Sequence, residues 1–334
     1  MKNLIIHTPE GFRDIYGSEI KKKKKLMRNL HKVFEAYSYE EIETPAVEYF
    51  DVFSSEVGTT PSNELYKFFD RDGYTLVLRP DFTPSVARAV AMHMPAEKLP
   101  VRLCYEGNTY VNSQEYQLNL KEQTQMGVEF IGDGSASADA EILRLTCDLL
   151  KKAGLTEFQV SVGNNDFFKA LAQDSGLPEE KIEEVRRQIS DKNFFGVSEL
   201  LEAEQVSPQI RDAFVRMPQL FGGREILKEA AQYAVNDGAK AALARLTEIA
   251  DMLSESGCDR YISFDLGLLS KYHYYTGMIF SAFTYGTGEP VAKGGRYDNL
   301  LGHFGTDAPA VGVGIGINPL MNALNRKSAR EANE

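Results

Sequence analysis

The chain has 334 residues, of which 43% are hydrophobic and 25% are charged. These proportions are typical of globular domains and exclude disordered and collagen-like classes. No apolar run approaches the ~20 residues that span a membrane, and the N-terminal apolar stretch is too short for a signal peptide. The net charge of −11 excludes a bulk electrostatic attraction for nucleic acid. We therefore expect a cytoplasmic protein with no membrane partner.

The three cysteines, Cys104, Cys147 and Cys258, are an odd number and form no C-x-x-C motif. This spacing provides neither a disulfide framework nor a zinc site, so we predict three buried thiols and no metal. The Gly132-x-Gly134 pair follows a predicted strand, but Ser137 stands where a dinucleotide fingerprint needs its third glycine. We expect no cofactor.

A helix is predicted over residues 18–37, because apolar residues recur there at helical spacing. The lysine run 21–25 then forms the solvent-facing side of an amphipathic helix rather than a nucleic-acid site. A short strand over 39–43 ends at Thr44-Pro45.

The next segments alternate between strand and helix signals. β-branched and apolar content predicts strands, and helices are predicted from Pro84 and before Gly154. The predicted strands are 74–79, 100–105, 109–118, 122–131 and 158–162, and the predicted helices are 84–94 and 136–153. The sheet is expected to be largely antiparallel.

Residues 166–257 have long apolar spacings that predict successive helices without strands. Strand signals return at 261–266, 278–283 and 311–317, before a helix over 319–325 and an irregular polar tail over 326–334. The fold class is therefore α+β. Residues 1–165 and 258–334 form the predicted sheet domain, and 166–257 form a helical insertion.

Polar residues gather within these strand-like segments. Gln123, Gln125 and Glu129 are separated by even numbers of residues, so a strand directs them to one face of the sheet. Arg79 and Asp81 stand at the end of another strand. Buried carboxylates need partners, which a hydrogen-bond-donating ligand could supply. The residues alone leave two interpretations open, a ligand pocket and a solvent-exposed face.

The glycines of the Gly312-Val-Gly314-Ile-Gly316 segment alternate within an apolar strand. Such alternation allows backbone, a helix or a ligand to approach one face of the strand closely.

Six segments, in order along the chain, together resemble the catalytic domain of histidyl-tRNA synthetase. They are Thr8-Pro-Glu-Gly-Phe-Arg-Asp14, Tyr39-Glu-Glu-Ile-Glu-Thr-Pro45, Leu78-Arg-Pro-Asp-Phe-Thr83, Gln125-Met-Gly-Val-Glu129, Tyr274-Tyr-Thr-Gly277 and Gly294-Gly-Arg-Tyr-Asp298. The resemblance covers nearly the whole chain. It implies a class II synthetase-like antiparallel sheet flanked by helices, a helical insertion, and a dimer formed through the first motif around Pro45.

The chain departs from the synthetase pattern where ATP and the reacting carboxylate would be held. Val111 and Ser113 replace the arginine and glutamate of the second motif, Ser270 replaces the arginine of the histidine-specific segment, and Pro319 replaces the arginine of the third motif. Adenylate formation needs fixed cations to stabilise its developing charge. We therefore expect no catalytic residues. The chain also ends shortly after the third motif, which leaves no room for an anticodon-binding domain and predicts no binding of tRNA.

The positions that match the histidine-binding side of the synthetase pocket are retained. By resemblance, three residues face the α-amino group and three face or adjoin the imidazole: Asp81, Thr83 and Gln125, and Glu129, Tyr275 and Tyr274, respectively. The carboxylate of histidine loses its synthetase partner at Ser270, and Lys271 and Arg296 are the candidate replacements.

A chain that keeps the ligand side and lacks the catalytic side resembles the regulatory subunits of ATP phosphoribosyltransferase, which are paralogues of the synthetases. This resemblance implies assembly with a short-form catalytic subunit, which requires the regulatory subunit for activity. It also implies feedback inhibition by L-histidine of the first step of histidine biosynthesis. The alternatives are a truncated synthetase-like enzyme that activates histidine or a related substrate, and a module that senses uncharged tRNA.

Overall fold

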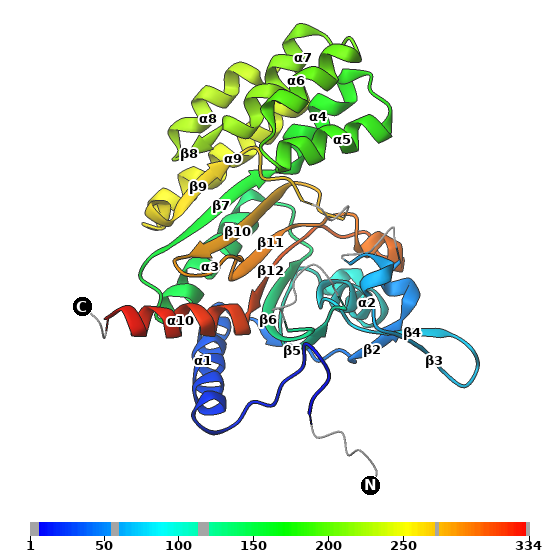
Figure 1. Cartoon of the computed structure of the whole chain (residues 1–334), viewed down its shortest axis with the longest axis vertical. Coiled ribbons are helices and arrows are strands. Elements are labelled where there is room, and N and C mark those ends of the chain that lie inside the picture. The colour runs from blue at the N-terminus through cyan, green and yellow to red at the C-terminus, as the bar shows by residue number, and fades with distance from the viewer. Residues whose placement is uncertain (1–6, 55–59, 113–119, 271–273, 332–334) are drawn as a thin grey trace.

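The computed structural model describes residues 7–54, 60–112, 120–270 and 274–331. Its centre is a nine-stranded sheet with the strand order β1-β5-β6-β12-β11-β10-β7-β9-β8 (Figure 1). The strands are β1 Glu40–Glu41, β5 Val101–Tyr110, β6 Glu122–Ile131, β7 Phe158–Asn164, β8 Phe221–Gly222, β9 Ile262–Asp265, β10 Met278–Thr284, β11 Ala292–Arg296 and β12 Ala310–Gly316.

Most neighbouring strands of this sheet are antiparallel. The exceptions are the parallel pairs β1 with β5 and β7 with β9. The long hairpin of β5 and β6 places Leu103 opposite Glu129 and Gly107 opposite Gln125. The predicted α+β class and the largely antiparallel sheet are confirmed.

Helices cover both faces of the sheet near β5 and β6. Helices α1 (Gly17–Ala36) and α3 (Ala136–Ala153) share a hydrophobic cluster with Met126, Val128 and Phe130 of β6. Helix α2 (Thr83–His93) belongs to a second cluster with Leu103 and Tyr105 of β5. Successive strand residues point to opposite faces, so Gln125 and Glu129 lie on the α2 side. Gln125 and Glu129, two of the residues predicted to bind a ligand, therefore lie in the same layer as α2.

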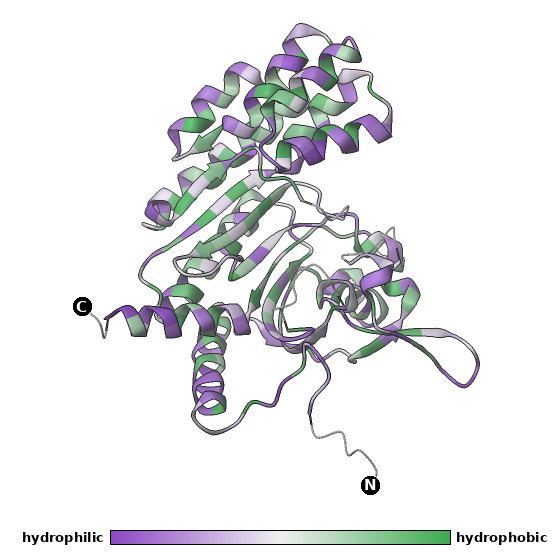
Figure 2. Cartoon of the chain, viewed as in Figure 1, coloured by the Kyte–Doolittle hydropathy of each residue, from purple (hydrophilic) through white to green (hydrophobic). Residues whose placement is uncertain are grey.

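The segment between β7 and β9 is mainly helical, and it lies beyond one end of the sheet in Figure 1. Its helices are α4 Asn165–Ser175, α5 Glu179–Ser190, α6 Phe194–Ala203, α7 Pro208–Arg216, α8 Glu225–Ala230 and α9 Asp237–Glu255. Figure 2 shows hydrophobic stretches of these helices turned toward one another. Their buried residues belong to the same hydrophobic cluster as α1 and α3. The exact domain boundaries stay a prediction.

A second, three-stranded sheet lies beside α2 and has the order β2-β4-β3 (Figure 1). Its strands are β2 Val47–Tyr49, β3 Lys67–Phe69 and β4 Thr75–Leu78. The sequence predicts only β4 of these strands. Strands as short as β2 and β3 carry too few residues for alternation to be visible in the sequence.

Several element boundaries differ from those predicted. Strand β5 is continuous through residue 110, so the predicted strands 100–105 and 109–118 are wrong as separate elements; Ser113 and its neighbours lie outside the described residues. Helix α10 (Ile317–Glu331) continues through most of the predicted irregular tail. The helical segment also contains strand β8, which pairs with β9.

Two local predictions are confirmed. The lysine-rich helix buries Leu26, Leu30, Val33 and Phe34 while most of its lysines are exposed. All three cysteines are buried, and none of them forms a disulfide.

Candidate functional site

Glu129 is the most deeply buried carboxylate of the predicted pocket, with 1% of its surface exposed. The Thr83 hydroxyl donates a hydrogen bond to Oε1 (2.7 Å), and the Tyr297 hydroxyl donates one to Oε2 (2.5 Å). Both donors are neutral, and burial raises the pKa of Glu129 to about 8. Each carboxyl oxygen can accept a further hydrogen bond, so Glu129 can bind a ligand N–H group, and a cationic ligand would favour the ionised carboxylate.

Glycines of β12 and β11 form the floor under these side chains. Gly312 lies opposite Glu129, and a Cβ atom on it would stand 1.8 Å from Oε2. A Cβ atom on Gly314 would stand 2.2 Å from Nε2 of Gln125. The alternating glycines thus admit the pocket's own carboxylate and amide over one face of β12. The glycine pattern predicted close approach by backbone, a helix or a ligand, and the groups that approach are the Glu129 and Gln125 side chains together with the Val128 backbone carbonyl.

Asp81 follows β4 and precedes α2. Its Oδ1 atom accepts a hydrogen bond from the Phe82 backbone N–H (2.7 Å). Burial raises the pKa of Asp81, while hydrogen bonds from the Phe82 and Thr83 N–H groups and from the Gln125 amide oppose that shift. The short segment 81–83 therefore delivers a carboxylate and the Thr83 hydroxyl to the same part of the pocket as Gln125 and Glu129.

The two tyrosines of the histidine-specific segment pack on each other, with ring centroids 4.4 Å apart. Tyr274 also meets the ring of Tyr297 edge-on at 6.0 Å. The Tyr275 ring lies over β11, because a Cβ atom on Gly295 would be 2.9 Å from it. Gly295 and Gly312 are paired across β11 and β12, and Gly312 is paired with Glu129. Tyr275 and Glu129 therefore lie along the same row of the sheet.

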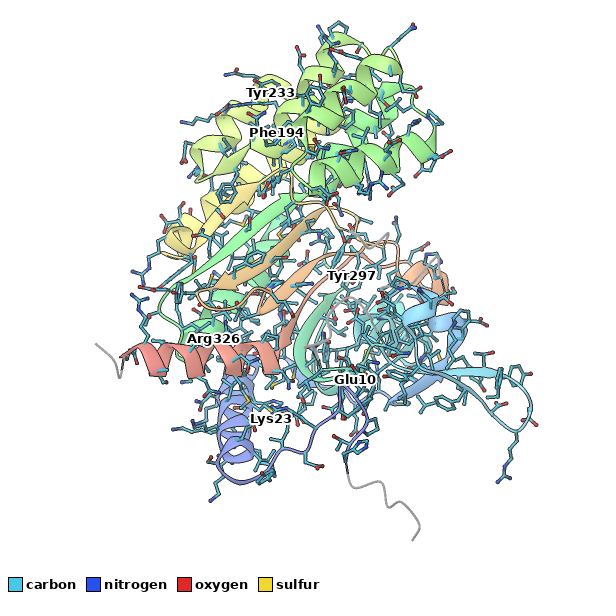
Figure 3. The ribbon with its side chains drawn as sticks, in the orientation of Figure 1. Glu10, Lys23, Phe194, Tyr233, Tyr297 and Arg326 are labelled. Atoms are coloured by element: carbon cyan, nitrogen blue, oxygen red, sulfur yellow. The ribbon has the colours of Figure 1, made fainter. Side chains whose placement is uncertain are left out.

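The structure brings together all six predicted histidine-binding residues and adds two that the sequence analysis missed. Tyr297, labelled in Figure 3, holds Glu129, and the Tyr105 hydroxyl accepts a hydrogen bond from Nε2 of Gln125 (3.3 Å). The parity of β5 and β6 could have indicated Tyr105, which lies opposite Gly127. Tyr297 lies within the Gly294-Gly-Arg-Tyr-Asp298 segment quoted for the resemblance, but no pattern in that segment indicates that its hydroxyl reaches Glu129.

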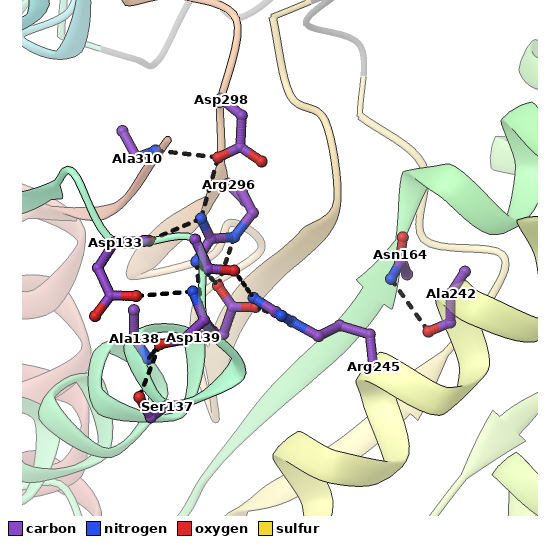
Figure 4. A network of polar contacts seen from close by, with 12 residues as sticks. Asp133, Ser137, Ala138, Asp139, Asn164, Ala242, Arg245, Arg296, Asp298 and Ala310 are labelled. Atoms are coloured by element: carbon purple, nitrogen blue, oxygen red, sulfur yellow. Dashed lines mark hydrogen bonds and ion pairs between the residues drawn. The ribbon is translucent and has the colours of Figure 1, made fainter. Parts of the chain in front are cut away.

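Arg296 is not a partner for a ligand carboxylate, which overturns one of the two candidate replacements. It is 4% exposed, and its guanidinium donates to Asp139 at 2.8 and 2.6 Å and to Asp298 at 3.0 Å (Figure 4). Asp139 also accepts a hydrogen bond from Arg245 of α9 (2.8 Å). Arg296 therefore joins β11 to α3. Lys271, the other candidate, lies outside the described residues.

The positions where synthetase arginines are replaced serve local structure. The Val111 N–H donates to the Lys121 carbonyl (3.0 Å), and the Ser270 N–H donates to Oδ1 of Asn165 (3.3 Å). Pro319 lies in the first turn of α10 and packs against Gly316. None of these three side chains can carry a positive charge.

Arg79, which the sequence analysis grouped with the polar pocket residues, has a structural role instead. Its Nη1 atom donates to the Thr44 carbonyl (2.7 Å) and its Nε atom donates to the Asn108 carbonyl (3.0 Å). The guanidinium also lies 3.9 Å from the centroid of the Phe82 ring. These contacts fix the segment that leads to Pro45.

Within the described ranges, no three His, Cys, Asp or Glu side chains converge as a metal site would require. The helices of the same ranges include none with the length and apolar character of a membrane span.

The largely antiparallel sheet and its flanking helices define a protein of the class II, histidyl-tRNA synthetase-like kind. The family model for histidyl-tRNA synthetase matches residues 11–320. The crystal structure of a histidyl-tRNA synthetase from Nostoc sp. PCC 7120 has the same fold, with a TM-score of 0.81 at 21% identity over 97% of this chain and 76% of that one. The predicted synthetase-like fold is confirmed.

Within this class, the chain belongs to the family of ATP phosphoribosyltransferase regulatory subunits. It is 41% identical to the regulatory subunit of Acetivibrio thermocellus over 96% of this chain and 77% of that protein. A crystal structure of an ATP phosphoribosyltransferase regulatory subunit/histidyl-tRNA synthetase from Bacillus halodurans superposes with a TM-score of 0.90 at 36% identity, covering 97% of this chain and 84% of that one. The prediction of a regulatory rather than a catalytic chain is confirmed.

Proposed function

We propose that this chain assembles with a short-form catalytic subunit of ATP phosphoribosyltransferase, is required for its activity, and conveys feedback inhibition by L-histidine. The observation that carries the proposal is the buried Glu129, held by two neutral hydroxyl groups beside Asp81 and Gln125. Two carboxylates in one buried site favour a ligand that carries hydrogen-bond donors and positive charge.

Histidine has the donors that this arrangement requires. Its ammonium group can donate to Asp81 and to the amide oxygen of Gln125, and an imidazole N–H can donate to Glu129. The Tyr275 ring lies along the same row of the sheet as Glu129 and provides a wall for the imidazole. The missing cations at Val111, Ser270 and Pro319 support binding without activation of the ligand.

The proposal is tested with the reconstituted complex. Formation of phosphoribosyl-ATP is measured against histidine concentration for the wild type and for Glu129→Ala, with the exposed Glu289→Ala as the control. Loss of a charged hydrogen bond of about 1.5–3 kcal/mol should raise the inhibitory concentration roughly 10- to 150-fold. Glu289→Ala should leave it unchanged. Coinciding curves for the wild type and Glu129→Ala would show that the inhibitor binds elsewhere.

Assembly is tested separately by co-purification of the untagged chain with a tagged short-form catalytic subunit. Addition of the chain should raise the activity of the catalytic subunit. The absence of both a stable complex and an effect on activity would contradict the assembly part of the proposal.

We also propose that the chain forms a dimer through the small sheet that follows Pro45. Tyr49, Leu76 and Phe68 lie opposite one another on β2, β4 and β3, so they share a face. Val47 and Tyr74 extend this apolar row, in which Tyr49 is 55% and Tyr74 is 60% exposed. A contiguous exposed apolar surface on a sheet favours a protein partner, and an identical copy supplies a matching surface by two-fold symmetry.

We propose that the chain functions in the cytoplasm, with no role for tRNA or a membrane. Residues 166–257 act as a helical insertion in the sheet domain. The negative net charge supports the exclusion of tRNA.

A further inference from the structure

Lys293 lies on the pocket face of the sheet, although no motif marks it. It is directly opposite Gly314 in the pairing of β11 with β12, and directly opposite residues of an antiparallel pair project to the same face. A Cβ atom on Gly314 would touch the Gln125 amide. The backbone of Lys293 therefore lies next to the glycine that the Gln125 amide covers, and Lys293 is exposed.

The next residue of β11 on this face confirms the direction. Gly295 is two positions after Lys293, and a Cβ atom on it would be 2.9 Å from the Tyr275 ring. The residues between and beyond them project to the other face, where Arg296 binds Asp139. Lys293 is thus a neighbour, on one face of the sheet, of Gly314, which lies against the Gln125 amide, and of Gly295, which lies against the Tyr275 ring.

An amino-acid ligand brings a carboxylate as well as donors, and that carboxylate needs a positive partner. Arg296 is committed to Asp139 and Asp298. Lys169 of α4 donates to the Tyr275 carbonyl (3.1 Å) and has Asp166 at 3.9 Å. Lys293 is exposed and lies on the same face of the sheet as the side chains proposed to hold the rest of the ligand.

We propose that Lys293 binds the α-carboxylate of the amino-acid ligand, in place of the arginine that the synthetases carry at the position of Ser270. This inference rests on the proposed function, because it requires histidine in the pocket. In an amino acid, the ammonium and carboxylate groups are attached to the same carbon atom. An ammonium group bound by Gln125 and Asp81 therefore brings the carboxylate close to Gly314. Paired Cα atoms in antiparallel strands are only about 4.5–5.5 Å apart, and the four-carbon stem of lysine is flexible enough to reach over that glycine.

The experiment compares two ligands by titration calorimetry on the full chain. L-Histidine carries the carboxylate, whereas L-histidinol has a hydroxymethyl group there and keeps the ammonium and imidazole. Lys293→Ala should weaken histidine binding roughly 5- to 30-fold, as expected for a partly exposed charged contact, and should change histidinol binding less than about 2-fold. Lys293→Arg should recover most of the histidine affinity.

Two further variants separate a local contact from a general loss of charge. Lys25→Ala removes an exposed lysine from α1, on the other side of the sheet, and should affect neither ligand. Lys271→Ala tests the remaining sequence candidate. Equal weakening of both ligands by Lys293→Ala, no weakening of histidine, or a histidine-selective loss in Lys271→Ala alone would overturn the inference.

Failure of this inference is distinguishable from failure of the proposed function. If the wild-type chain binds no histidine, the proposed effector role fails and the inference falls with it. If the wild type binds histidine and Lys293→Ala does not discriminate between the ligands, only the role of Lys293 is wrong. Thermal unfolding of each variant shows that the fold is retained.

Discussion

The Tyr297 hydroxyl donates a hydrogen bond of 2.5 Å to Oε2 of Glu129, and both side chains are about 1% exposed. The Tyr297 N–H donates to the Ala310 carbonyl (2.8 Å), which fixes this tyrosine at the start of β12. Burial and the neighbouring Glu129 raise the pKa of Tyr297 well above its usual range, so it remains a donor. Glu129 is therefore oriented before any ligand arrives.

The first prediction concerns the cost of ionising Glu129 in the ligand-free protein. Its folded pKa of about 8 is above its ordinary value of 4.5, so the folded state binds the proton more tightly than the unfolded state. The free energy of unfolding should then fall as pH rises from about 4.5 to about 8. Glu129→Gln removes this contribution. The melting temperature of Glu129→Gln minus that of the wild type should be larger at pH 8.5 than at pH 5.5; a constant difference would contradict it.

The second prediction concerns the glycine floor. A methyl group on Gly312 would meet Oε2 of Glu129 at 1.8 Å and the Val128 backbone carbonyl at 2.6 Å. The Glu129 side chain can move away from this methyl group, but the Val128 carbonyl belongs to the paired strand β6 and cannot. Gly312→Ala should therefore lower the free energy of unfolding by about 2–4 kcal/mol in urea titrations, and should weaken histidine binding. Gly288→Ala, where a methyl group meets nothing within 4 Å, is the control and should have little effect.

The third prediction concerns the unequal importance of the two arginines that share Asp139. Asp139→Ala leaves the buried Arg296 guanidinium without its main partner, which should cost about 3–5 kcal/mol of unfolding free energy. Arg245→Ala should cost only about 1 kcal/mol of unfolding free energy, because the Arg245 side chain is 27% exposed and Asp139 retains its ion pair with Arg296. Similar losses in the two variants, measured by chemical denaturation, would show that α9 depends on this contact as much as β11 does.

The fourth prediction concerns catalysis. Histidine-dependent exchange between ATP and pyrophosphate should not exceed a no-protein control, because Val111, Ser270 and Pro319 provide no cation. Restoring one arginine, for example by Ser270→Arg, should not produce exchange, since groups that act as a unit are strongly non-additive. Exchange clearly above the control in the wild type would favour the alternative of a truncated synthetase-like enzyme.

The fifth prediction concerns the dimer. Tyr49→Asp places a charge in the middle of the apolar row of the small sheet and should shift the chain from dimer to monomer in sedimentation velocity at micromolar concentration. Tyr285→Asp changes a tyrosine that is 74% exposed elsewhere and should leave the dimer intact. A wild-type chain that sediments as a monomer would refute the proposed dimer.

The strength of the local signals explains which elements could be predicted. The helix that became α3 has a regular apolar period and ends at Gly154, whose φ of 107° favours glycine, so its end was predictable. The division of β5 into separate strands over 100–105 and 109–118 was an error, because residues 106–108 also pair with β6. Hydrogen bonds to β6 keep the strand continuous through Tyr110.

The sequence by itself determined the fold class and the replacement of the synthetase cations, and it predicted the six positions proposed to bind histidine, because each depends on residue identity, strand parity or a set of ordered motifs. Tertiary structure alone decided which of the cations of β11 is buried and which is exposed. Arg296 and Lys293 are three residues apart on β11, yet the first is buried against Asp139 and the second is exposed beside Gly314. Burial and partnership depend on segments distant in the chain, such as α3 and β12, and so the sequence around β11 does not encode them.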